Sequence, residues 1–160
     1  MDTHDYKKTA LIIRLIIATG IRTSELPSIT IEAVQQGHVK LDFNNSTRRV
    51  TLPAILCVQL LQFANDSGIF SGSIFLTKTG LPCGRNAMYR AFRKLATAAG
   101  IEPARLTSES LRKYYNDKHS EVENITTVQS YLGYKSVNYF VEYNQQDDKT
   151  LSKNLDEILA

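Results

Sequence analysis

Three residues of this sequence, Tyr143, Arg22 and Arg112, carry side chains that could together do chemistry on a phosphate. A tyrosine phenol can attack an electrophile and become a covalent carrier. Guanidinium groups form paired hydrogen bonds to phosphate oxygens and stabilise the charge that develops there. The combination suits attack on a phosphodiester, with the phenol as nucleophile and the arginines on the non-bridging oxygens.

Each of these residues stands in a distinctive stretch of sequence. The three stretches are Thr19–Leu26, Leu111–Tyr115 and Leu132–Tyr143. Together they resemble the catalytic domain of the tyrosine recombinases, the phage integrase family, from about residue 7 to residue 143. The segment Phe75–Pro82, which precedes a basic helix, is most similar to integrases of conjugative transposons.

The resemblance implies a specific reaction on double-stranded DNA. Tyr143 would attack the scissile phosphate and hold a 3′-phosphotyrosyl link while the 5′-hydroxyl leaves, and Arg22 and Arg112 would bind the phosphate. Because the bond energy is kept in that link, neither ATP, a metal nor another cofactor is expected, and no small-molecule substrate. The implied protein is a site-specific recombinase or integrase of a mobile element, which cleaves DNA and exchanges strands.

Three of the six active-site positions usual in this family are altered. Glu109 stands three residues before the second arginine, where the family usually has histidine or lysine, and Tyr134 stands where it has histidine or tryptophan. A lysine usual on a β-hairpin is replaced by Asn44, which removes a candidate general acid. Lys40 is a candidate substitute on the same face of the strand, but about 13 Å away if the strand is extended.

These alterations leave a second function open, a recombinase-like DNA-binding module or regulator that does not cleave. Glu109 is the main difficulty, because a carboxylate beside Arg112 would pair with it or repel a phosphate. Arg22 in turn could form only a surface ion pair with Glu25. A third alternative is a structural or interaction domain in which the motif residues merely support the fold.

Positive charge is concentrated in the middle of the chain. The net charge is +3, but the segment Lys78–Lys118 holds nine basic and three acidic residues, +6, so the remainder sums to −3. One face is therefore expected to bind an anionic partner, here duplex DNA. The cations expected to contact DNA are Arg85, Arg90, Arg93 and Lys94 on one predicted helix, with Arg105 and Lys113 extending that surface.

The composition fits one domain, since 160 residues with 42% apolar content can bury a core. No apolar run is long enough to cross a membrane, and no signal-peptide layout begins the chain. Cys57 and Cys83 lack metal-ligand spacing, which favours a reduced protein without a structural metal. We expect a cytoplasmic, nucleoid-associated bacterial protein with no membrane partner.

The hydrophobic pattern predicts a mainly helical domain with a small antiparallel β-sheet, an α+β fold. Strands are predicted at 39–43 and 49–52, with turn residues at 44–47 between them. Helices are predicted at 6–18, 53–64, 84–99, 107–117, 125–132 and 135–142. The faces expected in the core are Ile55, Val58, Leu60 and Leu61 on one helix and Met88, Phe92, Leu95, Ala96 and Ala99 on another.

Residues 1–146 are expected to form the catalytic domain and residues 147–160 a docking helix. The apolar stripe of this tail, too narrow to fold alone, is Leu151, Leu155, Ile158 and Leu159. The resemblance implies that such a tail passes between protomers on DNA, so self-association on DNA is expected. The family usually has an N-terminal DNA-binding domain, which this chain is expected to lack, as an excised domain or a natural short protein.

Overall fold

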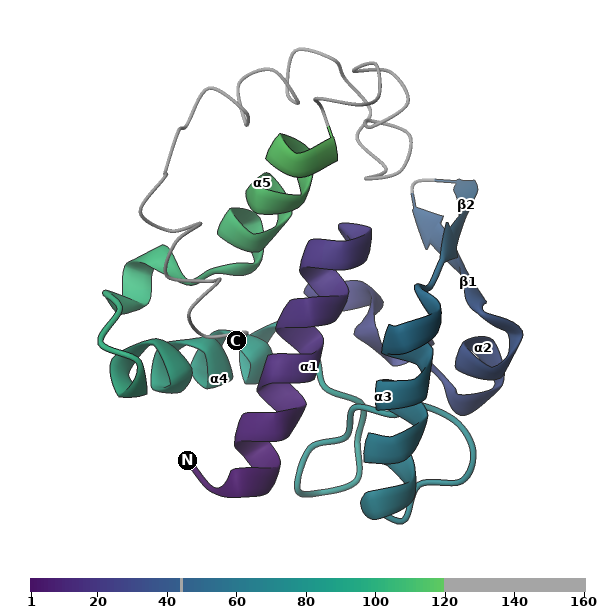
Figure 1. Cartoon of the computed structure of the whole chain (residues 1–160), viewed down its shortest axis with the longest axis horizontal. Coiled ribbons are helices and arrows are strands. Elements are labelled where there is room, and N and C mark those ends of the chain that lie inside the picture. Colours follow the sequence, from purple (N-terminus) through teal and green to yellow (C-terminus); the bar gives the residue numbers. More distant parts are fainter. Residues whose placement is uncertain (44, 120–160) are drawn as a thin grey trace.

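The computed structural model describes residues 1–43 and 45–119 (Figure 1). The predictions on Asn44, Tyr134 and Tyr143, on the last two helices and on the tail lie outside these residues. The described part is mainly helical with one two-stranded antiparallel sheet, as predicted. Its elements are α1 (Thr3–Thr19), the 3₁₀ helix η1 (Thr23–Ser28), α2 (Ile31–Gln36), β1 (His38–Phe43), β2 (Ser46–Thr51), α3 (Ala54–Asp66), α4 (Arg85–Ala98), the 3₁₀ helix η2 (Pro103–Arg105) and α5 (Ser108–His119).

Helix α1 is the centre of the described structure. Asp2 caps its start, because the Asp2 carboxylate accepts the backbone N–H of Asp5 at 2.7 Å. Gly20 ends it in the left-handed region with φ 69°, and the Gly20 N–H donates to the Ile16 carbonyl. In Figure 1, α4 and α5 lie on one side of α1 and α3 on the other, and α1 contacts all three. The predicted helix at 6–18 is confirmed, and it extends from Thr3 to Thr19.

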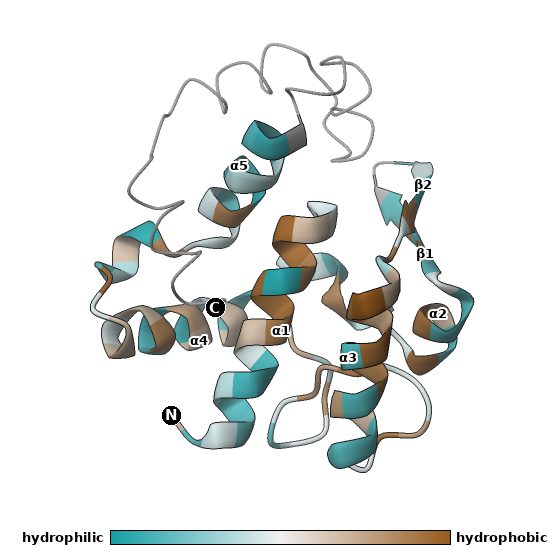
Figure 2. Ribbon diagram, in the orientation of Figure 1, coloured by the Kyte–Doolittle hydropathy of each residue, from teal (hydrophilic) through white to brown (hydrophobic). Residues whose placement is uncertain are grey.

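Apolar residues gather where α1 and its neighbours meet. Figure 2 shows apolar residues in the second half of α1 and along α3, whereas the first turns of α1 are hydrophilic. The core residues of α1 are Leu11, Ile12, Ile13, Leu15 and Ile16. Burial of so many branched side chains fixes where α1 ends in space. The segment that follows Gly20 therefore starts from a rigid point.

The β-hairpin has a tighter turn than predicted. Phe43 pairs with Ser46, so only two residues connect the strands, and Asn45 adopts a left-handed φ of 64°. Ser46 and Thr47, predicted as turn residues, belong to β2. Since side chains alternate along a strand, the register decides which residues face the domain.

The inner face of the hairpin carries Val39, Leu41 and Val50, all of them buried. Arg48 is paired with Leu41 and shares that inner face. Lys40 is exposed and paired with Arg49 on the outer face. The hairpin therefore directs one arginine inward and places Lys40 outward.

Helix α3 buries only part of the predicted stripe: Leu60 is fully buried and Leu61 packs partly buried against the core. The buried residues of α3 are Leu56, Leu60, Phe63 and Ala64. Ile55 and Val58 are 69% and 63% exposed, so their prediction as core residues was wrong. Two overlapping stripes fit the spacing of this helix, and burial of the large Phe63 ring beside Phe75 selects the other one. On α4 the predicted face is confirmed except for Ala99, which is exposed because the helix ends at Ala98.

The two cysteines of the described part are not reactive thiols. Cys57 and Cys83 are free, and burial raises the pKa of both thiols, so neither is poised as a thiolate at neutral pH. Among the described residues, none of the helices combines the length and apolar character that a membrane span would need.

A matched pair of substitutions tests the orientation of α3. Leu60→Ala should destabilise the fold by about 2–5 kcal/mol, because it leaves a cavity at a fully buried site. Val58→Ala, at an exposed site on the same helix, should change the free energy of unfolding by less than about 0.5 kcal/mol. Urea denaturation measures both, and similar losses would mean that α3 is rotated from this orientation.

Candidate active site and nucleic-acid interface

Arg22 begins a tight turn directly after α1. Its backbone N–H donates to Glu25 Oε2 at 2.8 Å, and the Glu25 N–H donates back to the Arg22 carbonyl at 2.9 Å. These reciprocal bonds close the first turn of η1 as in a capping box. The Arg22 Nη1 atom lies 3.7 Å from Glu25 Oε1. Glu25 is buried, so its contact with Arg22 is not the surface ion pair that the sequence left as an alternative.

Arg112 is held against the same turn from a distant part of the chain. Its side chain is 7% exposed, and its Nε donates to the Gly20 carbonyl at 3.0 Å across 92 positions of sequence. Gly20 precedes Arg22 by only two residues. The structure therefore brings Arg112 to the end of α1, beside the segment that carries Arg22.

Glu109 does not neutralise Arg112 in the described part of the chain. Glu109 is exposed, and no ion pair between the two is found among residues 1–43 and 45–119. The competing salt bridge that the sequence suggested is thus absent there. The negative charge of Glu109 still lies one helical turn from Arg112, close enough to affect an anion bound nearby.

A third arginine, which the sequence analysis did not select, joins this site from β2. Arg48 Nη2 lies 2.7 Å from Glu25 Oε2. Arg48 lies between the predicted turn residues 44–47 and the predicted strand at 49–52, so its inward direction was not predicted. Pairing with buried Leu41 is the signal that could have revealed it, because an arginine on a core-facing position requires an acidic partner.

We call Arg22, Arg48, Arg112 and Glu25 the arginine cluster. The Arg22 and Arg48 guanidinium groups pair with the Glu25 carboxylate, and Arg112 is bound to the Gly20 carbonyl beside them, so the formal charges of the four residues sum to +2. Such an excess of positive charge, held by buried contacts, can bind a phosphodiester and stabilise added negative charge on it. Lys40 is not part of the cluster, because it lies on the outer face of the hairpin.

The predicted DNA-contacting cations differ in their exposure. Arg85, Arg90, Arg93 and Lys94 are all exposed on α4, and the Arg93 guanidinium lies 5.5 Å from the centre of the Tyr89 ring. Arg105 is half-buried. Lys113 is buried, with its Nζ 3.0 Å from Asp117 Oδ2, so the expectation that it extends the exposed surface was wrong.

Helix α4 also borders a cationic cavity of about 600 Å³, which we call the α4 groove. Its charged lining comes from both sides of the groove: Asp5 and Lys8 on α1, Lys78 on a loop, and Arg90 and Lys94 on α4. The groove lies at the start of α1, fifteen residues before Gly20. At 1.5 Å per helical residue, Asp5 in its lining lies about 22 Å along α1 from Gly20.

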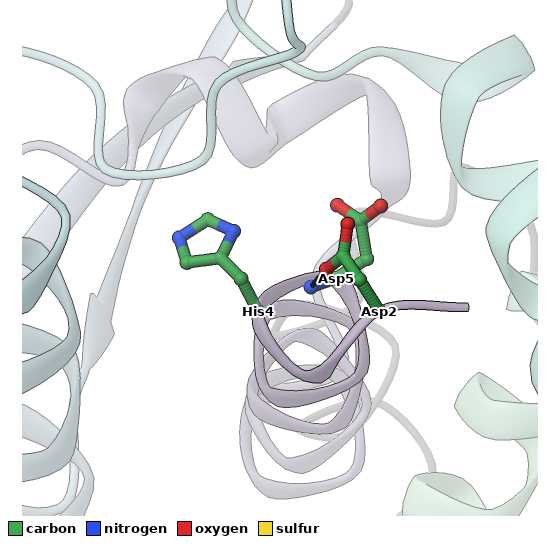
Figure 3. Close-up of side chains that lie close together, drawn as sticks. All are labelled: Asp2, His4 and Asp5. Atoms are coloured by element: carbon green, nitrogen blue, oxygen red, sulfur yellow. Dashed lines mark hydrogen bonds between the residues drawn. The ribbon is translucent and has the colours of Figure 1, made fainter.

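The start of α1 also brings together three potential metal ligands, Asp2, His4 and Asp5 (Figure 3), whose ligand atoms lie within 4.8 Å of one another. Each already has a structural partner. Asp2 accepts the Asp5 N–H, a bond that lowers the pKa of the Asp2 carboxyl, and Asp5 pairs with Lys8 at 3.1 Å. The His4 ring stacks on Phe63 and bonds Ser67. We therefore interpret this group as a helix cap.

Comparison with known proteins identifies the family. The model of the phage integrase family matches residues 1–150. The chain belongs to the phage integrase family. The resemblance inferred from the three sequence stretches is confirmed.

Solved structures share the fold of this integrase-family chain. XerA recombinase aligns with a TM-score of 0.71 at 18% identity, covering 98% of this chain and 62% of XerA. XerH recombinase in a post-cleavage complex with difH substrate aligns with a TM-score of 0.71 at 19% identity, covering 96% of this chain and 46% of XerH. The Tn1549 transposon integrase in complex with transposon right-end DNA aligns with a TM-score of 0.62 at 14% identity, covering 93% of this chain and 58% of that integrase.

The chain thus spans between about half and two thirds of the length of these proteins. The predicted tyrosine recombinase catalytic-domain fold is confirmed, and the expected likeness to transposon integrases has a counterpart in the Tn1549 enzyme. No curated protein sequence gives a significant match.

Two glycines with the same backbone conformation test the contact that joins Arg112 to α1. Gly20 and Gly100 have φ of 69° and 72°, so alanine at either position is strained by about 1–2 kcal/mol. Gly20→Ala should cost about 1–3 kcal/mol more than Gly100→Ala, because a shift of its carbonyl also breaks the bond from Arg112. Equal losses in urea denaturation would show that this bond does not hold the two segments together.

Proposed function

We propose that this chain is the catalytic domain of a site-specific DNA recombinase or integrase, acting through a 3′-phosphotyrosyl intermediate. The observation that carries the proposal is the bond from Arg112 to the Gly20 carbonyl, since it gathers the two arginine stretches at one end of α1. Membership of the integrase family and the DNA complexes of XerH and the Tn1549 integrase support it. Tyr143 is proposed as the nucleophile, with residues 1–146 as the catalytic domain.

In the proposed reaction the phenol oxygen of Tyr143 attacks the phosphorus, and the bond from phosphorus to the 5′-oxygen breaks. The phenol loses its proton as it attacks, and the 5′-oxygen takes up a proton and leaves as a hydroxyl. Arg22 and Arg112 hold the non-bridging oxygens, whose negative charge grows in the transition state. Since the phosphotyrosyl link preserves the energy of the broken bond, religation to another 5′-hydroxyl completes strand exchange.

Duplex DNA is the proposed partner, bound along the α4 groove and at the arginine cluster. The exposed cations of α4 would contact backbone phosphates without reading sequence. A duplex rises about 3.4 Å per base pair, so about 22 Å along α1 corresponds to roughly six to seven base pairs. Residues 147–160 are proposed to dock on a neighbouring protomer, where DNA raises the effective concentration.

The alternative is a recombinase-like domain that binds DNA without cleaving it. The replacements at Glu109, Tyr134 and Asn44 favour it, and so does Lys40, which the hairpin directs away from the arginine cluster. The positive charge that Arg48 adds to the cluster favours DNA cleavage instead.

A nicked suicide substrate decides between the two functions. When the short fragment that carries the new 5′-hydroxyl diffuses away, religation is prevented, and a cleaving enzyme is trapped as a covalent protein–DNA adduct at Tyr143. We expect an adduct from the natural chain and none from Tyr143→Phe, which lacks only the attacking oxygen. Denaturing gel electrophoresis and peptide mass spectrometry measure it, and DNA binding without adduct would establish the non-cleaving alternative.

The salt dependence of DNA binding tests the interface. Replacing both Arg90 and Arg93 with alanine should weaken binding to all sequences alike and reduce the slope of log K against log [salt] by about 2, because two phosphate contacts are lost. Lys7→Ala is the control, because Lys7 lines the separate cavity between α1 and α3. Fluorescence anisotropy at several salt concentrations measures the slopes, and equal slopes for all three proteins would remove α4 from the interface.

A further inference from the structure

Glu25 is shared by two cations from different elements. Its Oε2 atom accepts the Arg22 backbone N–H at 2.8 Å and lies 2.7 Å from Arg48 Nη2. The guanidinium of Arg22 is farther away, with Nη1 3.7 Å from Oε1. The closest cationic partner of this carboxylate is therefore the arginine of the hairpin.

The hairpin is built to deliver Arg48 to this point. Arg48 shares the inner face with Leu41, and its side chain is 10% exposed. The next residue, Arg49, points outward and is exposed, with its Nη2 3.1 Å from His38 Nδ1. A buried guanidinium is costly unless it is paired, so the ion pair with Glu25 also fixes the hairpin against η1.

The electrostatic consequence concerns Arg22. A carboxylate within 4 Å of a guanidinium cancels most of the charge that a bound phosphate would experience. With Arg48 present the cluster has a net charge of +2, and without it the charge falls to +1, with Glu25 left to pair with Arg22 alone.

We propose that Arg48 is a positioning residue of the active site, which neutralises Glu25 so that Arg22 and Arg112 retain their charge toward the scissile phosphate. The inference rests on the proposed function for its catalytic part. It also defines what the hairpin supplies. A guanidinium stays protonated at any pH at which proteins fold, so Arg48 provides a fixed charge and not the proton for the leaving 5′-oxygen.

Charge-removing variants separate this role from direct phosphate contact. Arg48→Gln should lower the rate of adduct formation on the suicide substrate by about 10²-fold, the cost of one lost cationic group in such a site. The double variant Glu25→Gln with Arg48→Gln removes both charges of the pair and should recover to within about tenfold of the natural rate. Arg49→Gln, the matched control on the outer face, should leave the rate unchanged.

Inorganic phosphate provides a readout that does not require cleavage. By isothermal titration calorimetry, Arg48→Gln should weaken phosphate binding by about tenfold, whereas Glu25→Gln alone, which raises the net charge of the cluster, should bind as well as or better than the natural chain. Arg48→Lys keeps the charge and should remain within about threefold. It also carries the test if Arg48→Gln does not fold.

Each outcome has a distinct meaning. If the double variant is as impaired as Arg48→Gln, or if Arg48→Lys fails like Arg48→Gln, Arg48 does not act through the charge of Glu25 and the inference is overturned. If Arg48→Gln matches the natural chain in phosphate affinity, Arg48 has no such role. A natural chain that forms no adduct would refute the proposed function, and the phosphate measurements would still decide the role of Arg48.

Discussion

The hydrogen bond from Arg112 Nε to the Gly20 carbonyl is the interaction on which the site depends. It connects α5 to the end of α1 and places Arg112 beside the Arg22 segment. The bond is available because Gly20 ends α1 in a left-handed conformation, which leaves its carbonyl outside the helical ladder. A conformational property of one glycine thus determines where the second arginine lies.

The position of α1 in turn depends on burial. Its central turns are covered by α3, α4 and α5, so both of its ends are fixed relative to those helices. One end carries the arginine cluster and the other borders the α4 groove. Helix α1, fixed by its burial in the core, therefore sets the spacing between the site proposed for cleavage and the surface proposed to bind the DNA backbone.

Local pattern was sufficient to predict most of the fold. The buried α1, its stop at Gly20 and the apolar face of α4 from Met88 to Ala96 follow from periodicity and capping, which act within a few residues. The stripe on α3 was partly mistaken because Ile55 and Leu56 begin equally good helical patterns, and only packing of Phe63 against distant residues decides between them. Arg48 was missed for a related reason. Its direction depends on a two-residue turn, and a one-residue change in strand register reverses every side chain. The pairing of Glu25 with Arg48 joins elements 23 residues apart and has no local signal.

The central claim is that Arg22 and Arg112 hold one phosphate between them, in a cluster whose excess charge Arg48 maintains. A crystal of the chain soaked with selenate, whose anomalous scattering locates a tetrahedral anion without ambiguity, tests it most directly. The account predicts one selenate at the end of α1, within hydrogen-bonding distance of both the Arg22 and the Arg112 guanidinium groups. Guanidinium groups that open onto different faces, or a selenate bound only along α4, would contradict it.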